Sequence, residues 1–196
     1  LLITWPYDEG GCACPDCYPW GSNGFIRASK RAFEIGAEYY PDAVRCISTW
    51  MFDTPEEGEW EALGESLEQE RWCDCILADA HEDYPRYPLD RGVPGGLPLL
   101  NFPEISMWGL SPWGGWGATM LPARFTRLWE QTEGKLDGGF LYSEGIYEDI
   151  NKAVVARLYF TGKSDPEDTL AQYARAELGM EDFGDFIRLV HLIEKT

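Results

Sequence analysis

Two adjacent carboxylates near the start of the chain are of the type that could cleave a glycosidic bond. Asp8 and Glu9 follow an apolar run, residues 1–5, and precede the pair Gly10-Gly11. Glycoside hydrolysis needs one carboxylic acid that protonates the leaving oxygen and a second group across the anomeric carbon. Aromatic neighbours would raise the pKa of Glu9 toward that of a general acid, while Asp8 would orient a substrate group. The structural alternative is a loop whose acids cap a turn or bind a cation.

Further carboxylates follow other apolar runs of the chain. Asp79, Glu104 and Glu144 stand at or just after three such runs. Glu144, within Tyr142-Ser143-Glu144-Gly145, is a candidate ligand for sugar hydroxyls, together with Tyr142. Asp79 or Glu104 could instead be the general base of an inverting reaction. Each of these acids, taken alone, could also be a solvated loop residue.

Tryptophans gather after the same runs. Trp50 lies near the end of one run, and Trp113-Gly114-Gly115-Trp116 forms a glycine-rich aromatic loop after another. An indole has a flat apolar face and a polar edge, which suits the ring of a sugar. Core packing explains any single tryptophan, but four on one rim favour a sugar-binding platform: Trp50, Trp108, Trp113 and Trp116.

Three cysteines form the tight cluster Cys12-x-Cys14-x-x-Cys17 in the loop after the first apolar run. Thiolates at this spacing can hold a structural zinc ion. Disulfides in a secreted protein and free thiols are the alternatives. No partner histidine at a recognised spacing supports a catalytic cysteine.

The elements that must position these residues alternate between strand and helix. The pattern predicts strands at residues 1–7, 44–52, 74–80, 97–103 and 139–143, and helices at 25–40, 54–72, 123–135, 147–160, 166–178 and 181–195. The segment Ser164-Asp165-Pro166-Glu167 and Gly179 mark the ends of the helix at 166–178. Such alternation is typical of parallel strands joined by right-handed crossovers.

Five strands suit an α/β fold that is part of a TIM barrel, about strands four to eight of (β/α)8, followed by C-terminal helices. Residues 1–160 would form the C-terminal half of the barrel, and residues 161–196 a helical segment after it. A doubly wound domain is the alternative, but the phosphate-binding glycine fingerprint is absent. The missing N-terminal half of the domain would then be a partner. We expect the 196-residue chain alone to be weakly stable, aggregating or inactive.

Composition excludes some partners. The formal net charge of −18 argues against nucleic acid and anionic membrane surfaces, because both need a positive field. No apolar run reaches the length of a membrane span. A neutral sugar, recognised by stacking and hydrogen bonds, stays possible.

Several of these residues resemble those of two glycosidase families. The strand that ends in Asp8-Glu9, the strand-end tryptophans and Tyr142-Ser143-Glu144 resemble the barrels of β-N-acetylhexosaminidases. The tail that contains Asn151-Lys152, Asp165-Pro166-Glu167 and Leu178-Gly179 is similar to the segment after the barrel in α-glucuronidases and related glycosidases.

The resemblance implies a glycosidase, with periplasmic or extracellular location. As in hexosaminidases, Glu9 would be the general acid/base and Asp8 would hold a 2-acetamido group whose oxygen attacks the anomeric carbon. As in α-glucuronidases, Glu9 would be the acid while Asp79 or Glu104 activates water.

The sequence also departs from both families. Trp5-Pro6-Tyr7 replaces the His-x-Gly-Gly of many hexosaminidases, and no basic cluster suits a uronate, so the sugar is open. A non-catalytic carbohydrate-binding barrel and a zinc-stabilised interaction module are the alternatives from other classes.

Overall fold

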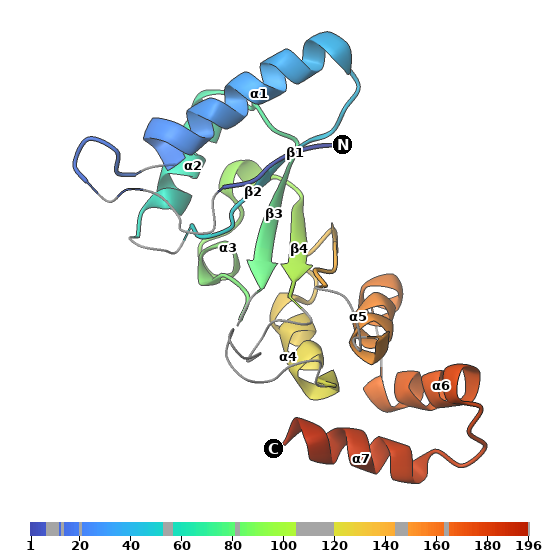
Figure 1. The fold of residues 1–196 in the computed structure, drawn as a ribbon. Helices are drawn as coiled ribbons and strands as arrows, with labels where there is room; N and C mark the ends of the chain where they lie inside the picture. Colours follow the sequence, from blue (N-terminus) through green and yellow to red (C-terminus); the bar gives the residue numbers. More distant parts are fainter. Residues whose placement is uncertain are drawn as a thin grey trace. The chain divides into compact units, whose positions relative to one another are not determined.

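The computed structural model describes residues 1–6, 12, 14–19, 21–52, 57–80, 83–104, 120–143, 149–162 and 165–195. Its five strands are β1 (Leu2–Thr4), β2 (Arg45–Ser48), β3 (Cys75–Ala80), β4 (Leu99–Pro103) and β5 (Gly138–Gly139). They follow the sheet order β1-β2-β3-β4-β5, and the described pairs are parallel (Figure 1). The predicted α/β class with parallel strands is therefore confirmed, whereas closure into a TIM barrel stays a prediction.

Helices follow most of the strands, as expected for parallel crossovers. The described helices are α1 (Ile26–Tyr39), α2 (Glu59–Gln69), α3 (Arg86–Asp90), α4 (Pro122–Thr132), α5 (Asp149–Thr161), α6 (Pro166–Leu178) and α7 (Gly184–Glu194). A π-helical turn, η1 (Gly21–Phe25), precedes α1, and a 3₁₀ turn, η2 (Pro94–Gly96), precedes β4. Among the described residues, no helix has both the length and the apolar character that crossing a bilayer requires.

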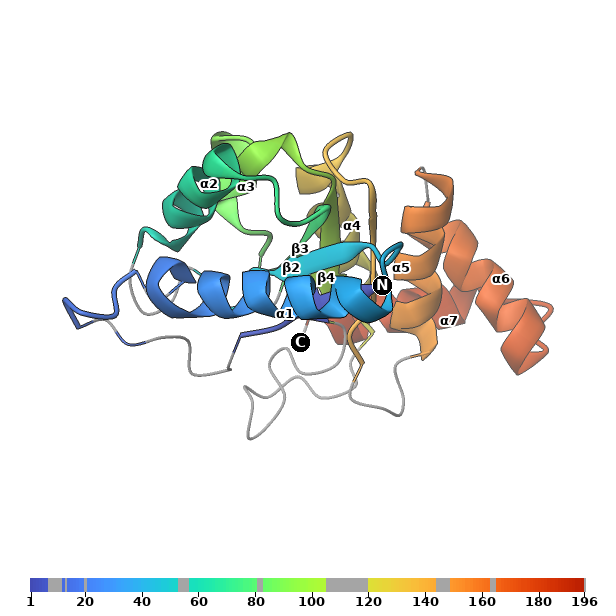
Figure 2. The ribbon, with the colours of Figure 1, turned by 90° about the horizontal axis from the view of Figure 1, so that it is seen from above.

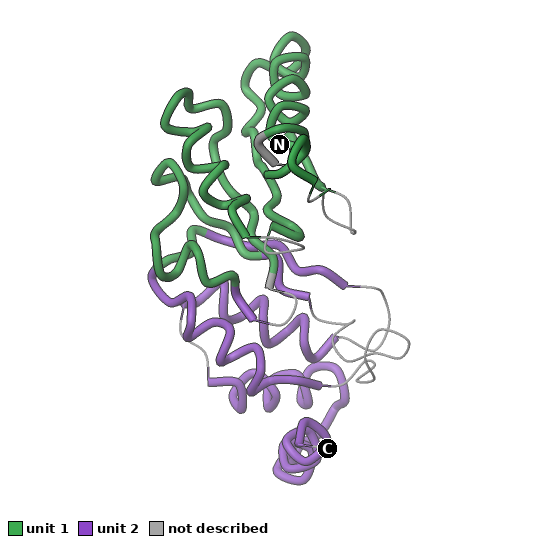
Figure 3. The backbone as a smooth tube through the Cα atoms, turned by 90° about the vertical axis from the view of Figure 1, so that its left-hand side faces the viewer, with its two compact units in different colours: residues 1–79, 85–101, 135–137 green, residues 80–84, 102–134, 138–196 purple. Residues whose placement is uncertain are grey.

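The chain divides into two compact units (Figure 3). Unit 1 comprises residues 1–79, 85–101 and 135–137, and unit 2 comprises residues 80–84, 102–134 and 138–196. The core of unit 1 contains buried residues of β2 and β3, among them Ile47 and Ile76, and the aromatic pair Phe52–Trp60, whose ring centroids lie 5.7 Å apart. Helix α1 packs closely on β1 (Figure 2). Gly36 permits this approach, because a Cβ at its position would lie only 2.5 Å from Leu2 Cδ1.

Unit 2 is built mainly from α4, α5, α6 and α7, which pack on one another. Val154, Leu158 and Leu170 are fully buried in its core. The last helix of unit 2, α7, is bound to the start of α4. The Glu194 carboxylate accepts hydrogen bonds from the backbone N–H groups of Ala123 (3.0 Å) and Arg124 (2.8 Å). A carboxylate at this position satisfies free N–H groups of the first turn of α4 and interacts favourably with its helix dipole.

Two strands are shorter at their carboxyl ends than the sequence predicts. The first strand ends at Thr4, because Pro6 has no N–H to donate to a neighbouring strand. The second ends at Ser48, where the Ser48 hydroxyl accepts a hydrogen bond from Trp50 N–H at 3.1 Å and Met51 takes a positive φ of 62°. A local side-chain bond of this kind replaces the bond that a longer strand would make.

The fifth strand also differs from its prediction. The sequence predicts a strand at residues 139–143, but β5 covers only Gly138–Gly139. Tyr142 forms an isolated parallel bridge with Glu104. Helix α3 and the turn η2 were not predicted. Both contain proline, which is accepted in the first turn of a short helix.

Candidate functional site

The carboxyl ends of β1, β2 and β3 bring three candidate side chains to one edge of the sheet in unit 1. The strands are parallel, with Leu2 paired to Arg45 and Cys46 paired to Cys75. Trp5 follows β1, Trp50 follows β2, and Asp79 lies near the end of β3. In parallel α/β proteins, ligands bind at this edge of the sheet.

The indoles of Trp5 and Trp50 contact each other. Their ring centroids lie 5.9 Å apart, with an angle of 35° between the planes. Trp5 remains 38% exposed and Trp50 is half-buried. The sequence pointed to Trp50 but not to Trp5 as a platform residue. Trp5 could have been found from its position directly after a strand in a parallel fold.

The backbone around Trp50 is held firmly. Thr49 N–H donates to the Leu77 carbonyl at 2.9 Å, and Trp50 N–H donates to the Ser48 hydroxyl at 3.1 Å. Ser48 and Thr49 are both buried. The loop therefore presents Trp50 from a fixed position, which lowers the entropy cost of stacking a ligand on it.

Asp79 is half-buried near the carboxyl end of β3. Glu104, the other predicted carboxylate that the structure describes, belongs to unit 2 and is fully buried. A partly accessible carboxylate can accept hydrogen bonds from sugar hydroxyls.

Glu104 and Tyr142 come together in unit 2. They form a parallel bridge, and Tyr142 N–H donates to the Pro103 carbonyl at 3.1 Å. The ring of Tyr142 packs on Phe102, with centroids 5.2 Å apart. Glu104 has 0% exposure, and its carbonyl accepts a hydrogen bond from the buried guanidinium of Arg124 at 3.1 Å. Sequence reasoning missed Arg124, because a helical arginine carries no signal of burial.

The other predicted site residues lie outside the described residues. These are Asp8, Glu9, Trp113, Trp116 and Glu144. Their assignment as acid, partner acid, sugar platform and hydroxyl ligand therefore stays a prediction.

The thiols of Cys12, Cys14 and Cys17 do meet. Their sulfur atoms all lie within 4.8 Å of one another, so together they could hold a metal ion. Hydrogen bonding, first from the Cys12 thiol, lowers the pKa of Cys14 to about 7, while the hydrogen bond to Cys14 raises the pKa of Cys17 to about 11. The remaining three cysteines are buried: Cys46 in β2, Cys75 in β3, and Cys73 just before β3.

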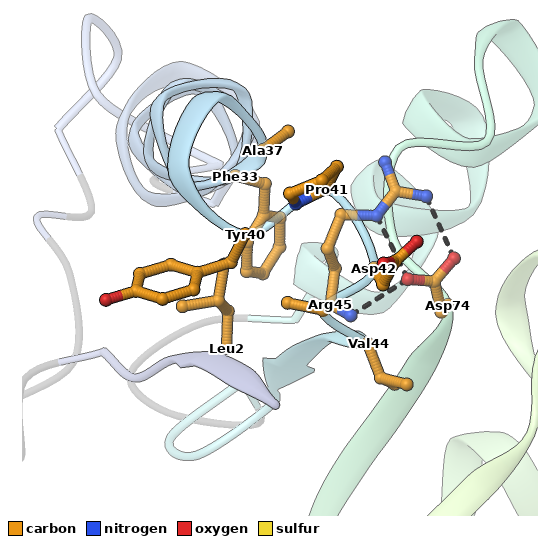
Figure 4. A pocket seen from close by; sticks show the side chains of 10 residues that line it. Leu2, Phe33, Ala37, Tyr40, Pro41, Asp42, Val44, Arg45 and Asp74 are labelled. Carbon is orange, nitrogen blue, oxygen red and sulfur yellow. Dashed lines mark hydrogen bonds and ion pairs between the residues drawn. The ribbon is translucent and has the colours of Figure 1, made fainter.

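A cavity of about 420 Å³ lies at the opposite, amino-terminal end of the strands in unit 1 (Figure 4). Leu2, Phe33, Tyr40, Arg45 and Asp74 contribute to its wall. The Asp74 carboxylate accepts hydrogen bonds from Arg45 Nη2 at 2.8 Å, Arg45 Nε at 3.0 Å and Arg45 N–H at 2.8 Å. These bonds lower the pKa of Asp74. Both charges are thus already satisfied by each other.

Comparison of the chain with known protein families, with curated proteins and with solved structures finds no match. The assignment of a function therefore depends on the residues themselves.

Proposed function

We propose that the protein is a glycoside hydrolase whose sugar-binding platform includes Trp5 and Trp50. The observation that carries the proposal is the contact between these two partly accessible indoles at the carboxyl ends of adjacent parallel strands. Asp79 ends the next strand in the same unit. Asp8 and Glu9 follow Trp5 by three and four residues in the sequence.

In this proposal Glu9 is the general acid. Its carboxyl proton passes to the glycosidic oxygen as the bond from that oxygen to the anomeric carbon breaks. Water then adds to the anomeric carbon. If a 2-acetamido oxygen has first held that position, Glu9 takes the proton that the water loses; if the water attacks directly from the opposite face, Asp79 or Glu104 takes that proton and Glu9 regains its own from solvent. Asp8 orients the acetamido group or the attacking water.

The remaining polar residues take supporting roles. Asp79 is better suited than Glu104 to contact the substrate, because Asp79 is partly exposed whereas Glu104 is fully buried. The roles of Trp113 and Trp116 as platform residues, and of Tyr142 and Glu144 as ligands of sugar hydroxyls, stay predictions from the sequence. A zinc ion on Cys12, Cys14 and Cys17 would be structural, and no step of the reaction passes through it.

The test is hydrolysis of 4-nitrophenyl N-acetyl-β-glucosaminide and 4-nitrophenyl α-glucuronide by the full-length protein and its Glu9→Gln variant. Loss of a general acid should lower the turnover number about 10²–10⁴-fold, while calorimetry should detect unchanged binding of the parent sugar. Glu38→Gln, which changes an exposed acid on α1, is the matched control and should retain full activity.

Two results would overturn the proposal. Sugar binding without hydrolysis by the wild type would identify a non-catalytic carbohydrate-binding protein. Absence of both binding and hydrolysis for both sugars would remove the carbohydrate assignment altogether.

A further inference from the structure

The loop after β1 holds a cluster of thiols that glycoside hydrolysis does not use. Cys12 is exposed, and Cys14 and Cys17 are half-buried, with all three sulfur atoms within 4.8 Å of one another. We infer that these three residues form a binding site for one zinc ion, whose fourth ligand is a water molecule or another exchangeable small ligand.

The distances fit this ion. Zinc binds thiolate sulfur at about 2.3 Å in tetrahedral geometry, which places the sulfur atoms about 3.8 Å apart. Because the thiols already lie within 4.8 Å of one another, side-chain rotation and small shifts complete the site. Thiolates favour soft metal ions over magnesium or calcium, which prefer oxygen ligands.

A hydrogen-bonded turn explains why the sulfur atoms meet. The Cys14 carbonyl accepts hydrogen bonds from Cys17 N–H at 3.0 Å and from Tyr18 N–H at 2.9 Å. This turn carries the chain back so that the side chains of Cys14 and Cys17 approach each other. The turn therefore brings two of the three thiols together before any ion binds.

The turn is also attached to the rest of unit 1. Asn23 Nδ2 donates to the Tyr18 carbonyl at 3.1 Å, and Asn23 N–H donates to the Pro19 carbonyl at 3.1 Å. The Tyr18 hydroxyl lies against Gly58, where an added Cβ would approach it to 2.5 Å. Gly58 directly precedes α2, so an ion on the thiols would link the loop after β1 to the start of that helix.

A disulfide would use fewer of these three thiols than a zinc ion would. A bridge between any two of the three cysteines leaves the third thiol unpaired, whereas one zinc ion uses all three. Zinc binding replaces thiol protons, so it releases protons to the solvent. This difference provides a direct way to distinguish the two states.

The experiment uses the full chain, reduced with a phosphine and freed of metal by a chelator. Titration with Co²⁺ should give intense thiolate-to-cobalt absorption that saturates at one ion per chain, and Zn²⁺ should abolish it by competition. Cys12→Ser and Cys14→Ser should each weaken zinc binding by more than about 100-fold, since even residues that only support a metal ligand contribute 10–100-fold.

Cys73→Ala is the matched control, because Cys73 is buried just before β3 and does not belong to the cluster of sulfur atoms. It should bind one ion with unchanged affinity. Circular dichroism confirms that each variant is folded, and Cys12→Ser, at the exposed position, disturbs the fold least. A wild-type chain that binds no ion when reduced, or a Cys12/Cys14/Cys17 triple serine variant that keeps its ion, would overturn the inference. Neither readout depends on glycosidase activity.

Discussion

The two ends of the parallel strands in unit 1 present different kinds of residues. At the amino-terminal end, Arg45 and Asp74 bind each other through three hydrogen bonds beside a cavity. At the carboxyl end, the rings of Trp5 and Trp50 contact each other, and Asp79 is half-buried. Charges that are already paired stabilise the sheet but have little capacity left for a ligand, whereas partly exposed indoles offer an apolar face on which a sugar ring can stack.

The same division is general among α/β barrels, where stability residues lie at one end of the strands and catalytic residues at the other. The cavity beside Arg45 is therefore the weaker candidate for a ligand site, because the charges in its wall are already paired. Substitutions in β2, which connects the two ends, at the carboxyl end and at the amino-terminal end test this comparison.

The largest effect is expected from Ile47→Ala in the middle of β2. Ile47 has 0% exposure, and truncating such a residue costs about 2–5 kcal/mol in unfolding free energy. Because Ile47 lies between Arg45 and Trp50, hydrogen exchange should accelerate at the amides of both residues. Urea unfolding and amide exchange by NMR measure the two effects.

Val44→Ala serves as the control for this change, because Val44 is 49% exposed. It should alter the unfolding free energy by less than about 0.5 kcal/mol. Faster exchange at only one of the two amides in Ile47→Ala would show that the ends of the sheet are stabilised independently.

An intermediate effect is expected from removing either indole at the carboxyl end. Trp5→Ala and Trp50→Ala should each weaken binding of N-acetylglucosamine or glucuronic acid about tenfold, or roughly 1.4 kcal/mol. The double variant should show a coupling of about 0.5–1.5 kcal/mol in unfolding free energy, typical of a contacting aromatic pair. Calorimetry and urea unfolding measure these values.

Tyr39→Ala removes an exposed aromatic side chain from the end of α1 and should leave sugar binding unchanged. Equal losses of affinity in Tyr39→Ala and Trp50→Ala would contradict a platform at the carboxyl end. Additive stabilities in the tryptophan pair would mean that the observed ring contact contributes no energy.

Local sequence signals predicted some elements well. Helix α6 begins and ends where expected, because its determinants lie next to it: the Asp165 carboxylate accepts from Glu167 N–H at 2.9 Å, Pro166 occupies the first turn, and Gly179 ends the helix with a φ of 65°. The strand ends were predicted less well. Where β2 stops depends on how the Ser48 hydroxyl is used, and an apolar pattern does not report that choice.

Contacts between strands could not be predicted at all. The pairing of Arg45 with Asp74 depends on the register of β2 against β3, and the contact of Trp5 with Trp50 depends on the register of β1 against β2. The sequence placed Trp50 at a strand end because that position is local. It did not indicate that Trp5 contacts Trp50, because these two residues are 45 positions apart and meet only after the sheet has formed.

The smallest effect is expected from Asp74→Asn at the amino-terminal end. The ion pair is partly exposed to solvent, with 39% of the Asp74 side chain accessible, so its contribution is reduced by screening to about 1 kcal/mol or less. Because Arg45 lowers the pKa of Asp74 in the folded state, the contribution is present above the unfolded pKa of about 3.9 and is lost as the pH falls through the folded value. The difference in unfolding free energy between wild type and Asp74→Asn should therefore be full at pH 7 and shrink below about pH 4.

Sugar affinity should be the same in both proteins at pH 7, because Asp74 lies at the end of the strands opposite to Trp50. Urea unfolding across this pH range, with calorimetry at pH 7, makes both measurements on one pair of proteins. A stability difference that is independent of pH would mean that the carboxylate charge contributes nothing, and the hydrogen bonds of a neutral side chain would then account for the whole effect. A change in sugar affinity would contradict the separation of the two ends, because a residue that stabilises one end would then control binding at the other.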